Sequence, residues 1–235
     1  MKASKWISSK PSLAVVVLVG LSFGLAAPAL GSLIDRGNGL IYDQDLNITW
    51  LQDANLVATN PFGLMQSATE FPTPGQIGST ALMNWFTANT WIAGMNAANY
   101  KGFNDWRLPT TAQPDASCSG QTIQPLGTGC IGSEMGHLFN VDGITAATSG
   151  LFSNVQIGFY WSGTEVATFP DVAWGLVFDS GIQGGSFKIA VASAWAVHSG
   201  DVVASVPEPS TMLLMGTGLL VLILYVWRRE RLHQS

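Results

Sequence analysis

The sequence has little charge, little histidine and little cysteine. Of its 235 residues only 11% are charged, three are His and two are Cys. So few charges exclude a long disordered or highly solvated chain. Residues 32–205 hold thirteen Asp or Glu against four cations and carry a formal charge of −9; the cations are Arg36, Lys101, Arg107 and Lys188. Because nucleic acids and anionic membrane surfaces are bound by clustered Lys and Arg, the composition excludes both as partners.

The scarcity of histidine also limits catalysis. Glu134 and His137 form a common helical pair rather than the two-histidine motif of zinc proteases, so we expect His137 to cap or pack a helix. The sequence contains neither a Gly-x-Ser-x-Gly nucleophile turn nor a phosphate-binding glycine loop with its Lys. We therefore expect no catalytic residues, no enzymatic activity and no firm cofactor.

The first 31 residues are typical of a secretory signal peptide. Three lysines precede an apolar run at 13–26, and small residues follow at 27–31, where signal peptidase would cut. A retained membrane anchor is the alternative, but the run is short for a membrane span. We therefore predict export across the inner membrane.

A second apolar run covers 211–227 and is followed by arginines at 228, 229 and 231. Seventeen residues at about 1.5 Å each reach about 25 Å, the short limit for a transmembrane helix. The arginines should stay cytoplasmic, which places the preceding domain outside the inner membrane. A buried helix of the folded domain is the alternative, but no polar face interrupts the run.

Cys118 and Cys130 are the two cysteines of the chain. Because an exported chain meets an oxidising compartment, we expect a disulfide between them. The intervening residues show no periodicity and are typical of a surface loop.

The region 32–205 mixes strand and helix patterns without a repeat. Apolar residues at helical spacing predict one helix from Thr80 to about Asn99 and a shorter one near 133–139. Alternating and β-branched segments predict a hairpin at 39–51 and strands at 159–162, 173–178, 187–191 and 194–198, with turns at 179–181 and 184–186. We expect one α+β domain in which one or two helices pack on an antiparallel sheet.

The last thirty residues, 206–235, resemble the PEP-CTERM sorting signal of Gram-negative bacteria. Pro207, Glu208 and Pro209 stand just before the apolar run and its arginines, in the order that the signal requires. The resemblance implies that an exosortase cuts near this motif after transient anchoring, and that the protein reaches the cell surface or extracellular matrix.

The segment Gly102-Phe-Asn-Asp-Trp-Arg-Leu-Pro-Thr110 strongly resembles the signature of the Lcl C-terminal domain family. Further segments resemble the family in order, at 39–54, 133–139, 160–165, 173–174 and 194–197. The resemblance implies a fold similar to C-type lectins and formylglycine-generating enzymes. The member that names the family is a bacterial adhesin that binds sulfated polysaccharide, but a domain of charge −9 is poorly suited to a polyanion.

The signature Asp105–Pro109 also has a physical reading of its own. Trp106 and Leu108 alternate in an extended segment, because Pro109 keeps its predecessor out of the helical region. Asp105 and Arg107 could pair with each other, or Arg107 with buried carbonyls. We expect a mainly structural role for the signature.

The corner of the predicted hairpin is the first of two candidates for ligand binding. Asp43, Asp45 and Asn47 match the first half of a calcium loop, but Ile48 and Ala54 replace its Gly and Glu, which excludes an EF-hand. A polar hairpin corner and a looser calcium site completed by Asp53 or Asp201 both stay open.

Trp91 falls outside the apolar stripe of the predicted long helix. It is therefore the first candidate among the tryptophans for stacking on a sugar.

These observations favour an exported, surface-sorted, non-enzymatic protein that binds polysaccharide, such as an exopolysaccharide, or a matrix component. The main alternative is a structural or protein-interaction module of the envelope or biofilm without a sugar site. An enzyme of the formylglycine-generating type is the third and remotest reading.

Overall fold

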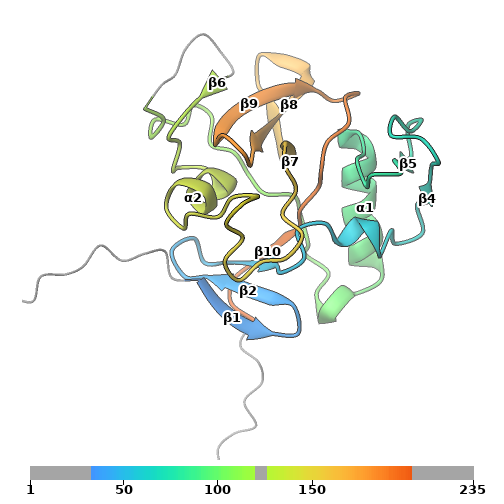
Figure 1. Cartoon of the computed structure of the whole chain (residues 1–235), viewed down its shortest axis with the longest axis horizontal. Coiled ribbons are helices and arrows are strands. Elements are labelled where there is room, and N and C mark those ends of the chain that lie inside the picture. The colour runs from blue at the N-terminus through green and yellow to red at the C-terminus, as the bar shows by residue number, and fades with distance from the viewer. Residues whose placement is uncertain (1–32, 120–125, 203–235) are drawn as a thin grey trace, which may run out of the picture.

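The computed structural model describes residues 33–119 and 126–202 and contains two antiparallel four-stranded sheets (Figure 1). The first sheet has the order β1-β2-β3-β10, with bounds Leu33–Gly37, Leu40–Asp43, Ile48–Leu51 and Val197–Ser199. The second has the order β6-β9-β8-β7, with bounds Leu126–Gly127, Ile182–Phe187, Phe169–Val177 and Phe159–Val166. The first and last strands of the domain therefore belong to the same sheet.

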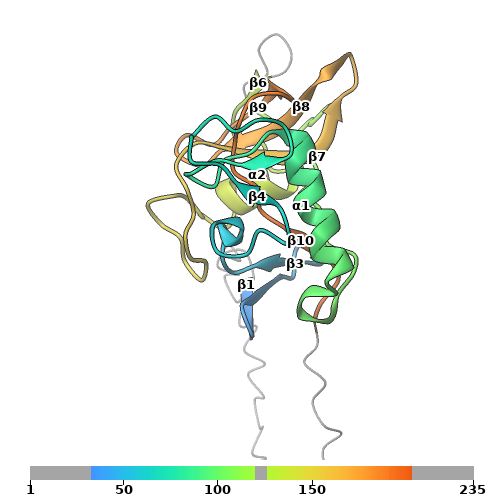
Figure 2. The ribbon, with the colours of Figure 1, turned by 90° about the vertical axis from the view of Figure 1, so that its right-hand side faces the viewer.

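Two α-helices accompany the sheets. The longer, α1 (Trp85–Ala97), runs along one side of the molecule, and α2 (Glu134–Asn140) lies between the two sheets (Figure 2). Smaller elements are the 3-10 turns η1 (Leu56–Ala58) and η2 (Tyr100–Gly102), and the parallel pair β4 (Met65–Gln66) and β5 (Gln76–Ile77). The predicted α+β class, with antiparallel sheets and two helices in one domain, is confirmed.

The predicted hairpin at 39–51 is formed by β2 and β3. Its corner is closed by Asp43, whose Oδ1 accepts the backbone N–H groups of Asp45 and Leu46, each at 3.1 Å. Asn47 has a φ of 51°, in the left-handed region that Asn tolerates better than most residues. The corner is therefore stabilised by side-chain to backbone hydrogen bonds of Asp43 and by the left-handed conformation of Asn47, both typical of these residue types in turns.

Helix α1 begins later than its periodicity predicts. Ala81 has a φ of 64° and lies in a turn, where its N–H donates to the carbonyl of Gly78. The helix starts only after Asn84, whose Oδ1 accepts the N–H of Thr87 at 2.8 Å. The expected start at Thr80 is therefore wrong. Ala81 belongs to a separate turn, and the helix begins only after its N-cap, Asn84.

The last part of the predicted sheet also differs from expectation. Gly184 and Gly185, predicted as a turn, lie within β9 and pair with Gly175 and Trp174 of β8. The turn comes after the strand, where the N–H of Ala190 donates to the carbonyl of Phe187 at 2.8 Å. A glycine is required at 175, because a Cβ there would lie 2.2 Å from the carbonyl oxygen of Tyr160.

Large aromatic rings fill the core between the sheets. Trp195, 1% exposed, is central and has ring contacts with four neighbours: Trp50, Phe152, Tyr160 and Phe178. Other fully buried rings are Trp91, Trp106 and Trp161. One continuous cluster of apolar side chains therefore joins the two sheets and α1.

Several predicted segments lie outside the described residues. These are the signal peptide at 1–31, the sorting motif Pro207–Pro209 and the membrane helix at 211–227. Within 33–119 and 126–202, no helix has the length and apolar character needed to cross a bilayer.

Candidate functional site

The signature segment is tied to both α1 and β10. Asn96 of α1 brackets Trp106, since its amide accepts the backbone N–H of Trp106 and donates to the Trp106 carbonyl, both at 2.8 Å. Arg107 exchanges two backbone hydrogen bonds of 2.9 Å with Val197. The side chains of Trp106 and Leu108 are 2% and 3% exposed. The segment thus joins the long helix to the last strand.

Arg107 forms a bidentate ion pair with Glu134, the first residue of α2. Its Nη1 and Nη2 lie 2.7 and 2.6 Å from the two carboxylate oxygens, and Nη1 also donates to the carbonyl of Leu108. The Glu134 carboxylate accepts the backbone N–H of Thr110 as well. Of the open alternatives for Arg107, the pair with Asp105 does not form, whereas a carbonyl contact does.

Asp105 instead faces His198, whose Nδ1 lies 3.8 Å from its carboxylate. The His198 ring is buried, stacks on Phe103 at 4.3 Å and meets Trp106 edge-on at 5.1 Å. Burial lowers the pKa of His198, and the nearby Asp105 only partly opposes that shift. His198 is therefore mainly a packing residue of the signature region.

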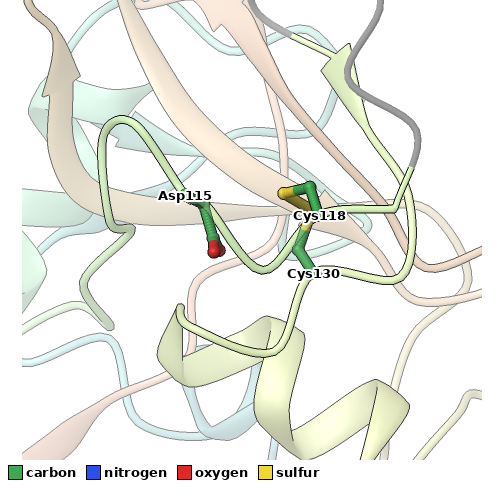
Figure 3. A group of neighbouring side chains, drawn as sticks. All are labelled: Asp115, Cys118 and Cys130. Carbon is green, nitrogen blue, oxygen red and sulfur yellow. A yellow bond between two sulfur atoms is a disulfide. The ribbon is translucent and has the colours of Figure 1, made fainter.

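Cys118 and Cys130 form a disulfide, and Asp115 lies beside it (Figure 3). Burial alone would raise the pKa of Asp115, but hydrogen bonds from Ser117, Ser133 and Gln183 outweigh it and lower the pKa. The sulfur atoms are used by the disulfide, so this group offers a metal no thiolate. Asp115 instead anchors the disulfide loop to the start of α2 and to β9.

A second group of ionisable side chains gathers between the first sheet and α2. It comprises Asp43 at the end of β2, Asp45, His137 of α2 and Asp142 just after that helix. Single ligand atoms of Asp43, His137 and Asp142 all lie within 4.8 Å of one another. The Nε2 of His137 lies 3.7 Å from a carboxylate oxygen of Asp45 and 3.9 Å from one of Asp142. We call these four residues the Asp–His cluster.

Burial and mutual repulsion disturb the carboxyl groups of this cluster. Burial, followed by the charge of Asp43, raises the pKa of Asp142 to about 6, although His137 opposes the shift. The pKa of Asp43 is also raised by burial, against weaker hydrogen bonds and the charge of His137. The ionised forms of both carboxyl groups are therefore disfavoured at this position.

The calcium candidates have different partners in the structure. Asp43 and Asp45 belong to the Asp–His cluster, but the side chain of Asn47 accepts a hydrogen bond from the hydroxyl of Tyr42 at 3.0 Å. Asp201 is paired with Arg36, and Asp53 bonds the backbone of Asn55 and the amide of Asn154. Among the described residues, the group that could hold a metal ion joins Asp43 to His137 and Asp142 and includes neither Asp53 nor Asp201.

Trp91 is buried with an exposed fraction of 0%, so its expected role in stacking on a sugar is wrong. Its indole N–H donates to the carbonyl of Asn60 at 3.0 Å, and its ring meets Phe62 at 6.2 Å. The loop before α1 covers this side of the helix, which therefore buries two sides instead of one.

The comparisons with known proteins agree with the arrangement of these elements. The family model of the Lcl C-terminal domain matches residues 39–198, from the first hairpin to β10. The chain belongs to the Lcl C-terminal domain family. The PEP-CTERM protein-sorting motif matches residues 205–230. None of the curated proteins is similar enough to this chain to count as a match.

All four cations of this Lcl C-terminal domain have partners. Arg36 pairs with Asp201, Arg107 with Glu134, and Lys188 with Glu165 at 3.0 Å. Lys101 donates to the carbonyl of Asn38. The described residues therefore present no cluster of unpaired cations for a polyanion.

The domain also exposes three large apolar side chains on the first turn of α1 and on the chain segment that is attached to it. Phe86, Phe187 and Ile189 are 52%, 65% and 79% exposed. The turn 187–190 is attached to the helix, because the N–H of Trp85 donates to the carbonyl of Lys188 and the Lys188 ammonium lies 4.7 Å from the Trp85 ring. The Trp85 ring in turn meets Phe86 at 5.6 Å. We call Phe86, Phe187 and Ile189 the outer apolar surface.

The sequence alone predicts neither the Asp–His cluster nor the outer apolar surface of the Lcl C-terminal domain. Asp142 carried one usable signal, since it follows directly after the helix that contains His137. The sequence pattern predicts Phe187 and Ile189 in one strand at 187–191, whereas they belong to the end of β9 and the turn that follows it.

Proposed function

We propose that this protein is a non-catalytic surface domain of a Gram-negative bacterium that binds a neutral polysaccharide or matrix component through its outer apolar surface. The PEP-CTERM signal implies exosortase-dependent sorting to the exterior. In this proposal signal peptidase removes 1–31, and the helix at 211–227 anchors the chain in the inner membrane until the exosortase acts.

The observation that carries the proposal is the exposure of Phe86, Phe187 and Ile189 on segments that Trp85 and Lys188 hold together. Apolar side chains cluster on the surface of a soluble domain mainly where it meets a partner. Aromatic rings can pack on the apolar face of a sugar, and a polymer presents many such faces. Because three of the four cations are in ion pairs and Lys101 stands alone, a neutral polymer fits this domain better than a sulfated one.

A non-catalytic role agrees with the chemistry of the described residues. Both cysteines are in a disulfide, and His198 is enclosed by Phe103 and Trp106. Binding to a multivalent polymer also needs only a modest affinity per domain, because many copies act together on one surface.

Replacing Phe187 by Ala should reduce retention on the neutral polysaccharide bound by the native domain by about tenfold or more. One well-packed aromatic ring at the centre of an interface often contributes over 1.4 kcal/mol, which corresponds to that factor. The measurement is a glycan array carrying neutral and sulfated polymers, followed by titration of the best ligand.

Ile157→Ala is the matched control. Ile157 is 78% exposed, but it belongs to the chain segment that connects α2 to β7 and is not part of the outer apolar surface. It should leave binding unchanged, and both variants should keep the native melting temperature. Binding only to sulfated polymers, or equal binding by both variants, would contradict the proposal.

The alternative is a structural or protein-interaction module, and the same outer apolar surface is the observation that favours it. An exposed Phe–Ile group also suits a protein partner. If the array shows no glycan binding but Phe187→Ala abolishes association with another surface protein, the alternative replaces the first proposal.

The surface-released protein should lack the apolar segment 211–227. The order of Pro-Glu-Pro, apolar run and arginines requires cleavage near 207–209 for release. Mass spectrometry of the C-terminal peptide checks this, with Glu208→Ala as the variant expected to accumulate in the cell. Recovery of an intact C-terminus from released protein would contradict the sorting step.

A further inference from the structure

We propose that Asp43, His137 and Asp142 form a binding site for a divalent transition-metal ion, for which Zn²⁺ is the probe. Asp45 is positioned to act as a fourth ligand, because its carboxylate lies 3.7 Å from Nε2 of His137. The site would be independent of the outer apolar surface and of any polysaccharide.

The first support is that these side chains lack the partners that buried polar groups require. Six buried side-chain nitrogen or oxygen atoms of the described residues have no hydrogen-bond partner. Four of them belong to this group: Oδ2 of Asp43, Nε2 of His137 and both carboxylate oxygens of Asp142. The Asp142 side chain is 0% exposed, so bulk water does not reach it.

A buried carboxylate without a donor is among the least favourable arrangements in a folded protein. The indole of Trp50 lies close enough to Asp43 to lower its pKa slightly, but its N–H does not reach hydrogen-bond geometry. A cation among these oxygens would satisfy all four atoms together, which no side chain of the described residues does.

The second support is geometric. Nε2 of His137 lies 3.7 and 3.9 Å from carboxylate oxygens of Asp45 and Asp142, beyond hydrogen-bond distance. A tetrahedral Zn²⁺ with bonds of about 2.0–2.1 Å holds its ligand atoms about 3.3 Å apart. The pairs of His137 with Asp45 and Asp142 need to contract by about half an ångström to reach this spacing, and the distances from Asp43, all within 4.8 Å, by at most about 1.5 Å.

The ligands are also held in place by their surroundings. The Oδ1 atom of Asp43 accepts the N–H groups of Asp45 and Leu46, which leaves Oδ2 directed away from the corner. The backbone N–H of Asp142 donates to the carbonyl of His137 at 3.3 Å, which fixes these two residues relative to each other. Such anchoring of ligand side chains is typical of metal sites in proteins.

The donor set decides which metal fits. One imidazole nitrogen with two or three carboxylates suits Zn²⁺ and related first-row ions. Calcium prefers six to eight oxygen ligands and gains little from an imidazole. The bound ion would connect the corner of the first hairpin to the end of α2, two segments far apart in the sequence.

The test uses the untagged full chain in detergent, without reductant, after removal of metals with EDTA. Equilibrium dialysis with elemental analysis should give one Zn²⁺ per chain, and Zn²⁺ at about one hundred times its Kd should raise the melting temperature by about 5–10 °C. Asp142→Asn and His137→Gln should each weaken the binding of Zn²⁺ more than tenfold.

Asp179→Asn is the matched control, because Asp179 is exposed and distant in sequence from the cluster; it should bind Zn²⁺ like the native chain. In EDTA, Asp142→Asn should melt at the same temperature as the native chain or higher, because one of three neighbouring negative charges is gone. With Zn²⁺ the order of the two melting temperatures should reverse, which a merely structural Asp142 would not produce.

Three outcomes would overturn the proposal. They are an unchanged stoichiometry in Asp142→Asn, an absence of binding at 1 mM Zn²⁺ (about the weakest affinity worth calling a site), and a preference for Ca²⁺ over Zn²⁺.

Discussion

Trp106→Ala should lower the free energy of unfolding by about 3–5 kcal/mol, the usual cost of removing a large buried ring. The ring is 2% exposed, its indole N–H donates to the carbonyl of Tyr100 at 3.0 Å, and it contacts Phe103 and His198. Domains are stable by only about 5–15 kcal/mol, so this loss is a large share of the total. Urea unfolding followed by circular dichroism measures it.

Phe71→Ala is the control for this prediction, because it also removes an aromatic ring but one that is 78% exposed. It should shift the unfolding free energy by less than about 0.5 kcal/mol. If Trp106→Ala instead leaves stability intact and removes only ligand binding, the signature is a binding site rather than a structural clamp.

Reduction of the disulfide between Cys118 and Cys130 should lower the free energy of unfolding by about 3 kcal/mol. In the chain-entropy model this is the effect of opening a loop of about 13 residues. Cys130 is fully buried against α2 and β6, so the reduced thiols also stay next to each other in the folded domain. Urea unfolding with and without reductant gives the difference.

The Cys118→Ser/Cys130→Ser double variant is the matched control. Its unfolding midpoint should resemble that of the reduced native domain and should not respond to reductant. A native domain with the same midpoint in both conditions would show that the disulfide contributes nothing to stability and that the hydrogen bonds of the loop hold it without the disulfide.

The elements that the sequence predicts well are those with local causes. The hairpin β2–β3 follows from its Asp- and Asn-rich corner, and α2 begins directly after Ser133 as expected. The errors in α1 and β9 arise where a local pattern competes with tertiary structure. Ala81 has the right spacing for α1, but it lies in a turn stabilised by Gly78.

Trp91 illustrates why exposure was harder to predict than secondary structure. A helical stripe identifies one apolar side, and a residue outside it is expected to face water. Here the irregular chain before α1 returns to the helix and supplies Asn60 and Phe62 as partners for the ring. The spacing of apolar residues along a helix does not predict where an irregular segment of the chain will pack.

The candidate sites could not be predicted for a related reason. The Asp–His cluster joins β2 to α2, and only the packing of α2 against the first sheet brings Asp43 and His137 together. The partner of Arg107 could not be predicted for the same reason, because Glu134 belongs to α2 and not to the signature segment. The residue types indicate which side chains need a polar or charged partner, but only the packing of the elements determines which residues become those partners.

The position of β1 and β10 in one sheet sets how the domain is presented to its surroundings. Arg36 and Asp201, near the two ends of the described chain, form an ion pair, so those ends leave the domain side by side. Figure 2 shows this sheet at one end of the molecule, with β8, β9 and the start of α1 toward the other. Both ends of the described chain therefore lie at the end of the domain opposite β8, β9 and the start of α1. A ligand held beside the start of α1 would be bound at the end of the domain that is remote from both chain ends.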